Sequence, residues 1–164
     1  MKKFLFVLML AFISFSLVAC AEIGVGGSAP EISAASWLNG NGLKLADCKD
    51  KYVVVEFWAT WCPPCRQSIP HLKTMNAKYK DKNVVFVSLT NESKETVTKF
   101  NEQFKMDWLV GTGSESANDY RVRGIPHAFI VKEGKVIWQG HPMDGLEEKL
   151  AELKKKKKKA GNRI

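Results

Sequence analysis

The chain has 164 residues, of which 45% are hydrophobic and 26% are charged, and its formal net charge is +8. This length suits one globular domain. The positive charge lies at the two ends: without Lys2, Lys3, the six lysines of 154–159 and Arg163, 16 basic side chains remain against 17 acidic ones. A nearly neutral body with no basic stripe interleaved with aromatic residues argues against nucleic-acid binding.

The first 19 residues have the pattern of an export signal. Two lysines precede an apolar stretch, residues 4–15, that is too short for a transmembrane helix. Leu17-Val18-Ala19-Cys20 resembles a bacterial lipobox, which implies cleavage before Cys20 and a diacylglycerol on its thiol. Ordinary cleavage after Ala21 is the alternative, because Ala19-x-Ala21 also fits a signal-peptidase site. Either way the mature protein is expected outside the cytoplasmic membrane.

The remaining chain divides into three predicted parts. Residues 20–30 are rich in glycine and form an expected anchor and flexible spacer. Residues 31–153 form the expected domain, and residues 154–164 form a lysine-rich tail that should fray from the last helix. The tail is either a solvated terminus or a segment attracted to anionic lipid headgroups.

The domain begins with a predicted β-hairpin, residues 32–37 and 43–45, joined by the turn Asn39-Gly40-Asn41-Gly42. The apolar run 53–58 predicts a central strand buried on both faces. The later patterns predict a helix over 63–80 that Pro70 bends or divides, a buried strand over 84–89, a helix over 93–104 capped by Ser93, a helical turn over 115–120, a hairpin of 128–131 and 135–138, and a helix starting at Leu146. This order predicts an α/β fold in which a parallel βαβ unit is followed by an antiparallel ββα unit.

The motif Trp61-Cys62-Pro63-Pro64-Cys65 follows the central strand and opens the next helix. A cysteine at a helix N-terminus favours its thiolate, which is the form that attacks disulfides, so the motif predicts a redox-active dithiol. A purely structural disulfide is one alternative. Half of a zinc site is another, but it needs a second ligand pair, and Cys48, His71, His127 and His141 are scattered, so no metal site is predicted.

Glu56 interrupts the apolar strand that leads to this motif. Burial of a carboxylate without a charged partner raises its pKa, so Glu56 is expected to hold a proton near pH 7. A charge at the exposed end of the strand is the alternative.

Residues 56–65, together with Gly124-Ile125-Pro126, resemble the thioredoxin superfamily. Ala29-Pro30 and residues 126–140 are similar to its TlpA/ResA-like branch of exported, membrane-tethered thiol-disulfide oxidoreductases, and the resemblance covers residues 28–153. It implies a thioredoxin fold with flanking helices and an N-terminal β-hairpin extension, and it implies no cofactor.

The resemblance also implies a role for each matching residue. Cys62 would be the exposed nucleophile that forms a mixed disulfide, and the more buried Cys65 would resolve it. Glu56 would exchange a proton with Cys65. Trp61 would shield the dithiol and offer an apolar face to a client. Pro126 would be a cis-proline that lets the Ile125 backbone pair with an extended substrate, although an ordinary trans turn proline is the alternative.

The implied partners are client proteins with disulfides and, for a reductase, a membrane electron donor with its own dithiol. The implied location is the periplasmic face of a bacterial membrane, with Cys20 as the lipid anchor. Ser68 is a departure, because the branch usually carries a glutamate three residues after the second cysteine. That departure puts in doubt the transfer of a specific partner such as apocytochrome c. Cys48 has no local partner and is either a regulatory thiol or a buried small side chain.

Two other functions are compatible with the fold. Peroxide reduction usually uses a Pro-x-x-x-Thr-x-x-Cys arrangement, and residues 55–62 lack the proline. A non-enzymatic lipoprotein, acting as a binding module or metallochaperone, is the second, although related copper carriers space their cysteines further apart.

Overall fold

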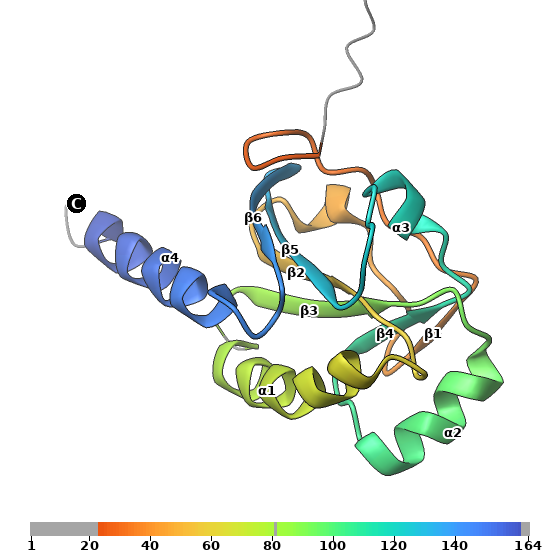
Figure 1. Ribbon diagram of the computed structural model, residues 1–164. Helices are drawn as coiled ribbons and strands as arrows, with labels where there is room; N and C mark the ends of the chain where they lie inside the picture. Colours follow the sequence, from red (N-terminus) through yellow and green to blue (C-terminus); the bar gives the residue numbers. More distant parts are fainter. Residues whose placement is uncertain (1–22, 81, 162–164) are drawn as a thin grey trace, which may run out of the picture.

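The computed structural model describes residues 23–80 and 82–161, which form a six-stranded mixed sheet with helices on both faces (Figure 1). The strands are β1 (Ser36–Leu38), β2 (Tyr52–Phe57), β3 (Val84–Leu89), β4 (Leu109–Thr112), β5 (His127–Lys132) and β6 (Lys135–Gly140). The helices are α1 (Pro63–Tyr79), α2 (Lys94–Phe104), α3 (Ser116–Asp119) and α4 (Leu146–Gly161), with a 3₁₀ turn, η1, at Leu45–Cys48.

The strands lie in the order β1-β4-β3-β2-β5-β6. The β2, β3 and β4 strands run parallel, while β1, β5 and β6 each pair antiparallel with a neighbour. The apolar run of β2 therefore lies inside the sheet, paired on both edges and buried on both faces, as predicted. The predicted order, a parallel βαβ unit followed by an antiparallel ββα unit, is confirmed.

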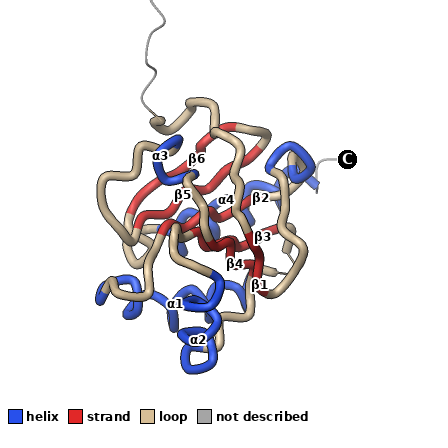
Figure 2. Tube along the Cα trace, turned by 90° about the vertical axis from the view of Figure 1, so that its right-hand side faces the viewer, coloured by secondary structure: helices blue, strands red, loops and turns tan. Residues whose placement is uncertain are grey.

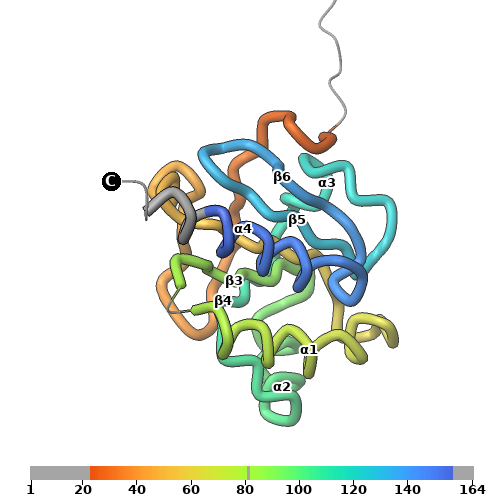
Figure 3. Tube along the Cα trace, turned by 90° about the vertical axis from the view of Figure 1, so that its left-hand side faces the viewer, coloured from red at the N-terminus to blue at the C-terminus, as the bar shows by residue number. Residues whose placement is uncertain are grey.

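Alternating side chains of β2 supply two separate cores. Val54 packs with α1 and α4 on one face, whereas Val53 and Val55 pack on the other face with the N-terminal segment and the residues around α3. Figure 1 shows α1 and α3 on opposite sides of the sheet, and Figures 2 and 3 view the molecule from the right and from the left of Figure 1. The α1 and α4 helices share one face, where their side chains pack in the same core. An ion pair between Lys78 and Glu147 joins these two helices.

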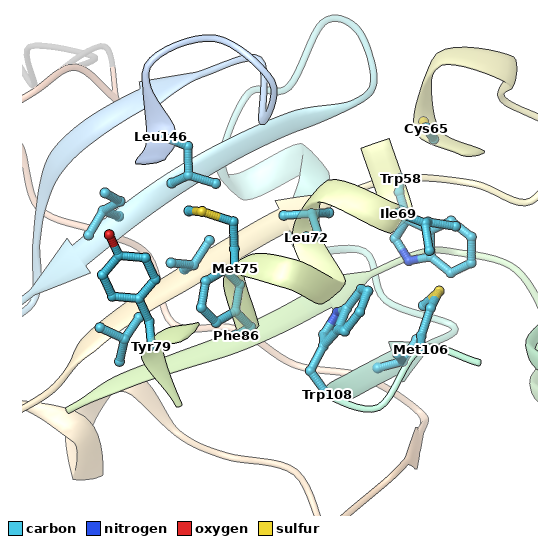
Figure 4. Close-up of a cluster of buried hydrophobic side chains, with 14 of the residues drawn as sticks. Trp58, Cys65, Ile69, Leu72, Met75, Tyr79, Phe86, Met106, Trp108 and Leu146 are labelled. Atoms are coloured by element: carbon cyan, nitrogen blue, oxygen red, sulfur yellow. The ribbon is translucent and has the colours of Figure 1, made fainter. Parts of the chain in front are cut away.

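The first core extends from the middle of the sheet to the start of α1 (Figure 4). Leu72, Met75 and Tyr79 follow one face of α1 and contact strand and α4 residues, while Cys65 lies at the end of the cluster beside Trp58. The apolar packing that stabilises α1 therefore reaches the dithiol itself.

Local sequence signals explain where two helices begin. The α1 helix starts with Pro63 and Pro64, whose missing N–H groups would have no partner at a helix start in any case. Pro70 does not divide α1, which is continuous to Tyr79. Ser93 caps α2, as predicted, by accepting a hydrogen bond from the Thr96 N–H.

The predicted N-terminal hairpin is wrong. Residues 36–38 form β1, but their partner is β4, and residues 43–45 form no strand. The Asn39 amide donates to the carbonyls of Met106 and Trp108, which ties this turn to the approach to β4. The Glu31 carboxylate accepts from the Leu45 and Ala46 N–H groups, and it thereby caps η1 instead of leaving these groups for a strand.

Two further differences concern β4 and α4. The pattern did not predict β4, which is four residues long and contains Gly111. The α4 helix continues through the lysine run to Gly161 rather than ending before it. Within residues 23–80 and 82–161, no helix combines the length and apolar character needed to cross a membrane.

Candidate active site

Cys62 and Cys65 are joined by a disulfide where β2 leads into α1. Cys62 is the N-cap of α1, and its sulfur accepts a hydrogen bond of 3.2 Å from the Cys65 N–H. Pro63 and Pro64 occupy the two positions between them and have no N–H to offer. One amide of the first turn thus points at the Cys62 sulfur.

The two cysteines differ less in exposure than expected. Cys62 is 2% exposed and Cys65 is fully buried, so the expected exposed nucleophile is covered in this disulfide form. The Ile125 loop contacts the Cys62 sulfur directly, and the Cys62 side chain packs in the first core. Trp61, in contrast, is 68% exposed and projects beside the dithiol.

The peptide bond between Ile125 and Pro126 is cis, as the resemblance implied. The Ile125 carbonyl oxygen lies 3.7 Å from the Cys62 sulfur. A disulfide sulfur has no hydrogen to donate, so this is a van der Waals contact in the present state. The contact brings a chain segment 63 residues away along the sequence against the dithiol.

Glu56 is buried, with 3% of its surface exposed, and lies in a short chain of hydrogen bonds. The Trp108 indole N–H donates to the Ser88 hydroxyl over 2.8 Å, and that hydroxyl donates to the Glu56 carboxyl. Because the indole is a donor only, it occupies a lone pair of Ser88 and directs the Ser88 hydrogen toward Glu56. The parallel register of β2 and β3, which pairs Glu56 with Ser88, creates this contact.

Ser68 connects the Glu56 carboxyl to the dithiol. Its hydroxyl interacts with Glu56 and donates to the Cys65 carbonyl oxygen over 2.8 Å. The single hydroxyl hydrogen can serve one acceptor at a time. A protonated Glu56 can donate to Ser68, whereas an ionised Glu56 requires the Ser68 hydrogen for itself.

Burial raises the pKa of Glu56 from 4.5 to about 7, and the hydrogen bonds from Ser88 and Ser68 oppose that shift. The expected rise in the pKa of Glu56 is therefore confirmed, and the carboxyl is about half protonated at pH 7. A group that titrates near pH 7 can accept or release a proton under ordinary conditions.

Sequence reasoning missed Ser88, Trp108 and Glu92. The Glu92 carboxylate accepts the Thr60 N–H over 2.6 Å and also the Thr60 hydroxyl, which fixes the loop just before Cys62. These three residues lie 26 to 46 positions after Cys62 and carry no motif. The parallel βαβ pattern was the available signal, since it places the end of β3 beside the end of β2.

The other cysteines and histidines do not join the site. Cys20 lies outside the described residues. Cys48 is free and packs in the second core, where burial raises the pKa of its thiol. The His127 ring contacts the Gln139 amide oxygen, and His141 lies in the turn after β6. Within the described part of the chain, no three His, Cys, Asp or Glu side chains form a group that could hold a metal ion.

Comparisons with known proteins agree with this site. The model of the AhpC/TSA family matches residues 25–139. The thiol-disulfide oxidoreductase ResA of Bacillus thuringiensis subsp. konkukian (strain 97-27) is 34% identical over 139 residues, which cover 82% of this chain and 79% of that protein. The thioredoxin-like protein YneN of Bacillus subtilis (strain 168) is 35% identical over 126 residues, covering 73% and 74% respectively.

A solved structure shows the same fold. The crystal structure of a thiol:disulfide interchange protein, DsbE, from Chlorobium tepidum superposes with a TM-score of 0.70 at 28% identity, and the match covers 80% of this chain and 99% of that one. The chain therefore belongs to the AhpC/TSA family and, with its thioredoxin-like fold and its Cys62–Cys65 dithiol, is a thiol-disulfide oxidoreductase of the ResA type.

Proposed function

We propose that the chain reduces disulfides of client proteins outside the cytoplasmic membrane, with Cys62 as nucleophile, Cys65 as resolving thiol and Glu56 as the group that accepts the Cys65 proton. The observation that supports this most directly is the pairing of a helix-start dithiol with a buried carboxyl whose pKa is about 7. Ser68 contacts both the carboxyl and the Cys65 backbone.

The reaction takes place in two exchanges. The Cys62 thiolate attacks one sulfur of a client disulfide, the client S–S bond breaks, and the released client thiolate takes up a proton. The Cys65 thiol then gives its proton to ionised Glu56 and attacks the Cys62 sulfur. The second client thiol leaves with a proton, the Cys62–Cys65 disulfide forms, and the client has gained two electrons and two protons.

Groups at the surface of the site support client binding. Trp61 presents an exposed aromatic side chain next to Cys62, and the Ile125–Pro126 segment lies against the Cys62 sulfur. An extended client can lie along the Ile125 backbone with its disulfide over Cys62. The oxidised enzyme is then reduced again by a membrane protein with its own dithiol.

The location rests on the N-terminal sequence. A signal followed by a lipobox implies that the domain, residues 31–153, is held at the periplasmic face of a bacterial membrane through a lipid on Cys20, with residues 20–30 as a spacer. A single acyl chain binds membranes only marginally, but the diacylglycerol on Cys20 carries two chains, which suffices for a stable anchor.

A redox titration of residues 21–164 tests the chemistry. The protein is equilibrated in graded dithiol and disulfide buffers, its free thiols are trapped, and the products are weighed by mass spectrometry. A two-electron transition confined to Cys62 and Cys65, with a reduction potential of about −270 mV, is expected for a reductase. A reduction potential of about −120 mV would indicate an oxidant of folding proteins instead. The absence of a transition, or one dominated by Cys48, contradicts the catalytic assignment.

A further inference from the structure

A short backbone segment beside the dithiol has free hydrogen-bonding groups. The segment Arg123–Ile125 runs into β5, and none of its N–H or C=O groups makes a backbone hydrogen bond to the described residues. Its last carbonyl lies 3.7 Å from the Cys62 sulfur. If an extended client strand pairs with this segment, the client residues next to the reactive cysteine lie beside Gly124 and Arg123.

The same segment borders a cavity of about 420 Å³, which we call the arginine groove. Its polar lining comes from Tyr120, Arg121, Arg123, Gly124, His127 and Gln139. The groove thus begins next to the residue that contacts Cys62 and continues away from it along the face of β5 and β6 where the second core lies.

The charges in the arginine groove are unbalanced. Arg121 and Arg123 are exposed, and neither forms an ion pair with a carboxylate among the described residues. The lining residues include two guanidinium groups and a histidine but no acidic side chain. The body of the protein is close to neutral, so this local excess of positive charge is a property of the groove rather than of the whole surface.

Two of the lining groups are fixed in orientation by each other. The Gln139 amide nitrogen donates to the Ile23 carbonyl, which turns its oxygen toward His127. The His127 Nε2–H then donates to that oxygen, because an amide oxygen can only accept. The wall of the groove formed by β5 and β6 is therefore held in place, while the two arginines on the opposite side are free to bind a ligand.

We propose that the arginine groove binds acidic side chains of the client segment next to the reactive cysteine, so that the enzyme prefers disulfides flanked by glutamate or aspartate. This inference rests on the proposed reduction of client disulfides and names the chemical class of client. Guanidinium groups suit this role because each can bind a carboxylate through two parallel hydrogen bonds. Since both arginines are exposed, the preference is modest and depends on salt.

Homodimeric disulfide peptides provide the probe, because attack on either sulfur gives the same products. Nine-residue peptides with one central cysteine carry Glu, Gln or Lys at the second and third positions on one side of it, in N-terminal and C-terminal versions. The reduced protein, freed of other reductants, is mixed with each peptide, and the free peptide thiol is measured over time. We expect Glu peptides to react about three- to tenfold faster than Gln peptides at low salt, and Lys peptides to react more slowly.

The position of the groove adds a sharper expectation. Both arginines lie on the same side of the dithiol, so one of the two peptide versions should show the preference more strongly than the other. Raising the salt to about 0.5 M should bring the Glu-to-Gln rate ratio close to one, because exposed charges are then screened within a few ångströms.

Two double variants, each of which removes two positive charges, test whether the preference for acidic peptides arises in the arginine groove. In R121Q/R123Q the Glu-to-Gln rate ratio should fall to about one. In K73Q/K135Q, which removes two exposed positive charges from α1 and from the far end of the β5–β6 hairpin, the ratio should stay as in the parent protein. An equal reaction rate for all peptides in the parent, or a preserved ratio in R121Q/R123Q, overturns the inference. Failure to reduce any peptide contradicts the proposed function, and the inference with it.

Discussion

The two sides of the disulfide differ in what they offer to the reaction. On the buried side, Glu56, Ser68 and Ser88 have almost no solvent contact. Ser88 donates to Glu56 and Ser68 donates to the Cys65 carbonyl, and both hydroxyls favour the ionised form of Glu56. On the surface side, Trp61 is exposed and the backbone of Arg123–Ile125 is unpaired within the described structure. Proton exchange is thus confined to the interior, while recognition is left to groups that have few contacts of their own.

This separation has a physical basis. Removing Glu56 from water raises the pKa of its carboxyl into the neutral range, which an exposed carboxylate would not reach. An exposed tryptophan and unpaired arginines, in contrast, can gain contacts when a partner binds. Cys65 faces the first environment and Cys62 borders the second, although only three positions separate them.

Serine substitutions at Cys62 and Cys65 should have the largest effect on activity and should separate the roles of the two cysteines. Either change should reduce turnover of a protein disulfide on the order of 10³-fold or more, because each removes a sulfur that the exchange requires. Cys65→Ser should nevertheless accumulate a mixed disulfide at Cys62, since the resolving thiol is missing. Cys62→Ser should accumulate none. Mass spectrometry after treatment with glutathione disulfide distinguishes these results.

The control for this experiment is Cys48→Ser, introduced into both variants so that the free Cys48 thiol cannot form an adduct. A stable adduct on Cys65 in the Cys62→Ser protein would contradict the assignment of nucleophile and resolving thiol.

The substitution Glu56→Gln removes the titrating group on the buried side of the disulfide, and it therefore tests how that group makes stability depend on pH. The pKa of Glu56 is about 7 in the folded protein and 4.5 without burial, so the folded state binds more protons between these values. The free energy of unfolding of the parent protein should therefore fall, relative to that of Glu56→Gln, as the pH rises from 4.5 to 7. The difference between the two pKa values corresponds to a total loss of about 3 kcal/mol in the free energy of unfolding, and this loss is complete near pH 8.

Urea denaturation of both proteins at pH 4.5, 6 and 8 measures this difference, with the dithiol oxidised throughout. The same substitution should slow the second exchange and remove the inflection near pH 7 from its rate. A stability difference that does not change with pH would show that Glu56 is not the buried titrating group.

The central part of the site could be predicted from sequence because its signals are local. The apolar run of β2, the two prolines and the two cysteines lie within 14 residues and determine strand, turn and helix start together. Glu56 was recognisable as a polar residue inside that run. The prediction of an N-terminal hairpin was wrong because the partner of β1 is β4, about 70 residues away, and no turn residue encodes that pairing.

The partners of Glu56 were outside the reach of sequence patterns for the same reason. The contact of Ser88 with Glu56 depends on the register between β2 and β3, and Trp108 reaches Ser88 from the loop before β4. Ser68 was visible only as a departure from the related branch. Its contact with both Glu56 and Cys65 depends on how α1 packs on β2.

Ser68→Ala should give the smallest effect, a further rise in the pKa of Glu56. The Ser68 hydroxyl favours the ionised carboxyl, so its removal leaves burial less opposed. The cost to stability should be small, on the order of 1 kcal/mol, because the Cys65 carbonyl can still accept the bond of a regular helix. The pH dependence of unfolding, read against Glu56→Gln, should shift to higher pH.

Ser88→Ala is the matched control, because Ser88 lowers the pKa of Glu56 more than Ser68 does and also accepts from the Trp108 indole. It should raise the pKa further than Ser68→Ala and should cost about 1–3 kcal/mol, since it leaves a buried donor unpaired. The reverse order of the two pKa shifts would mean that Ser68, rather than Ser88, is the main partner of ionised Glu56. The buried side would then depend chiefly on the helix that carries the dithiol, and movement of α1 upon reduction would change the proton affinity of Glu56 directly.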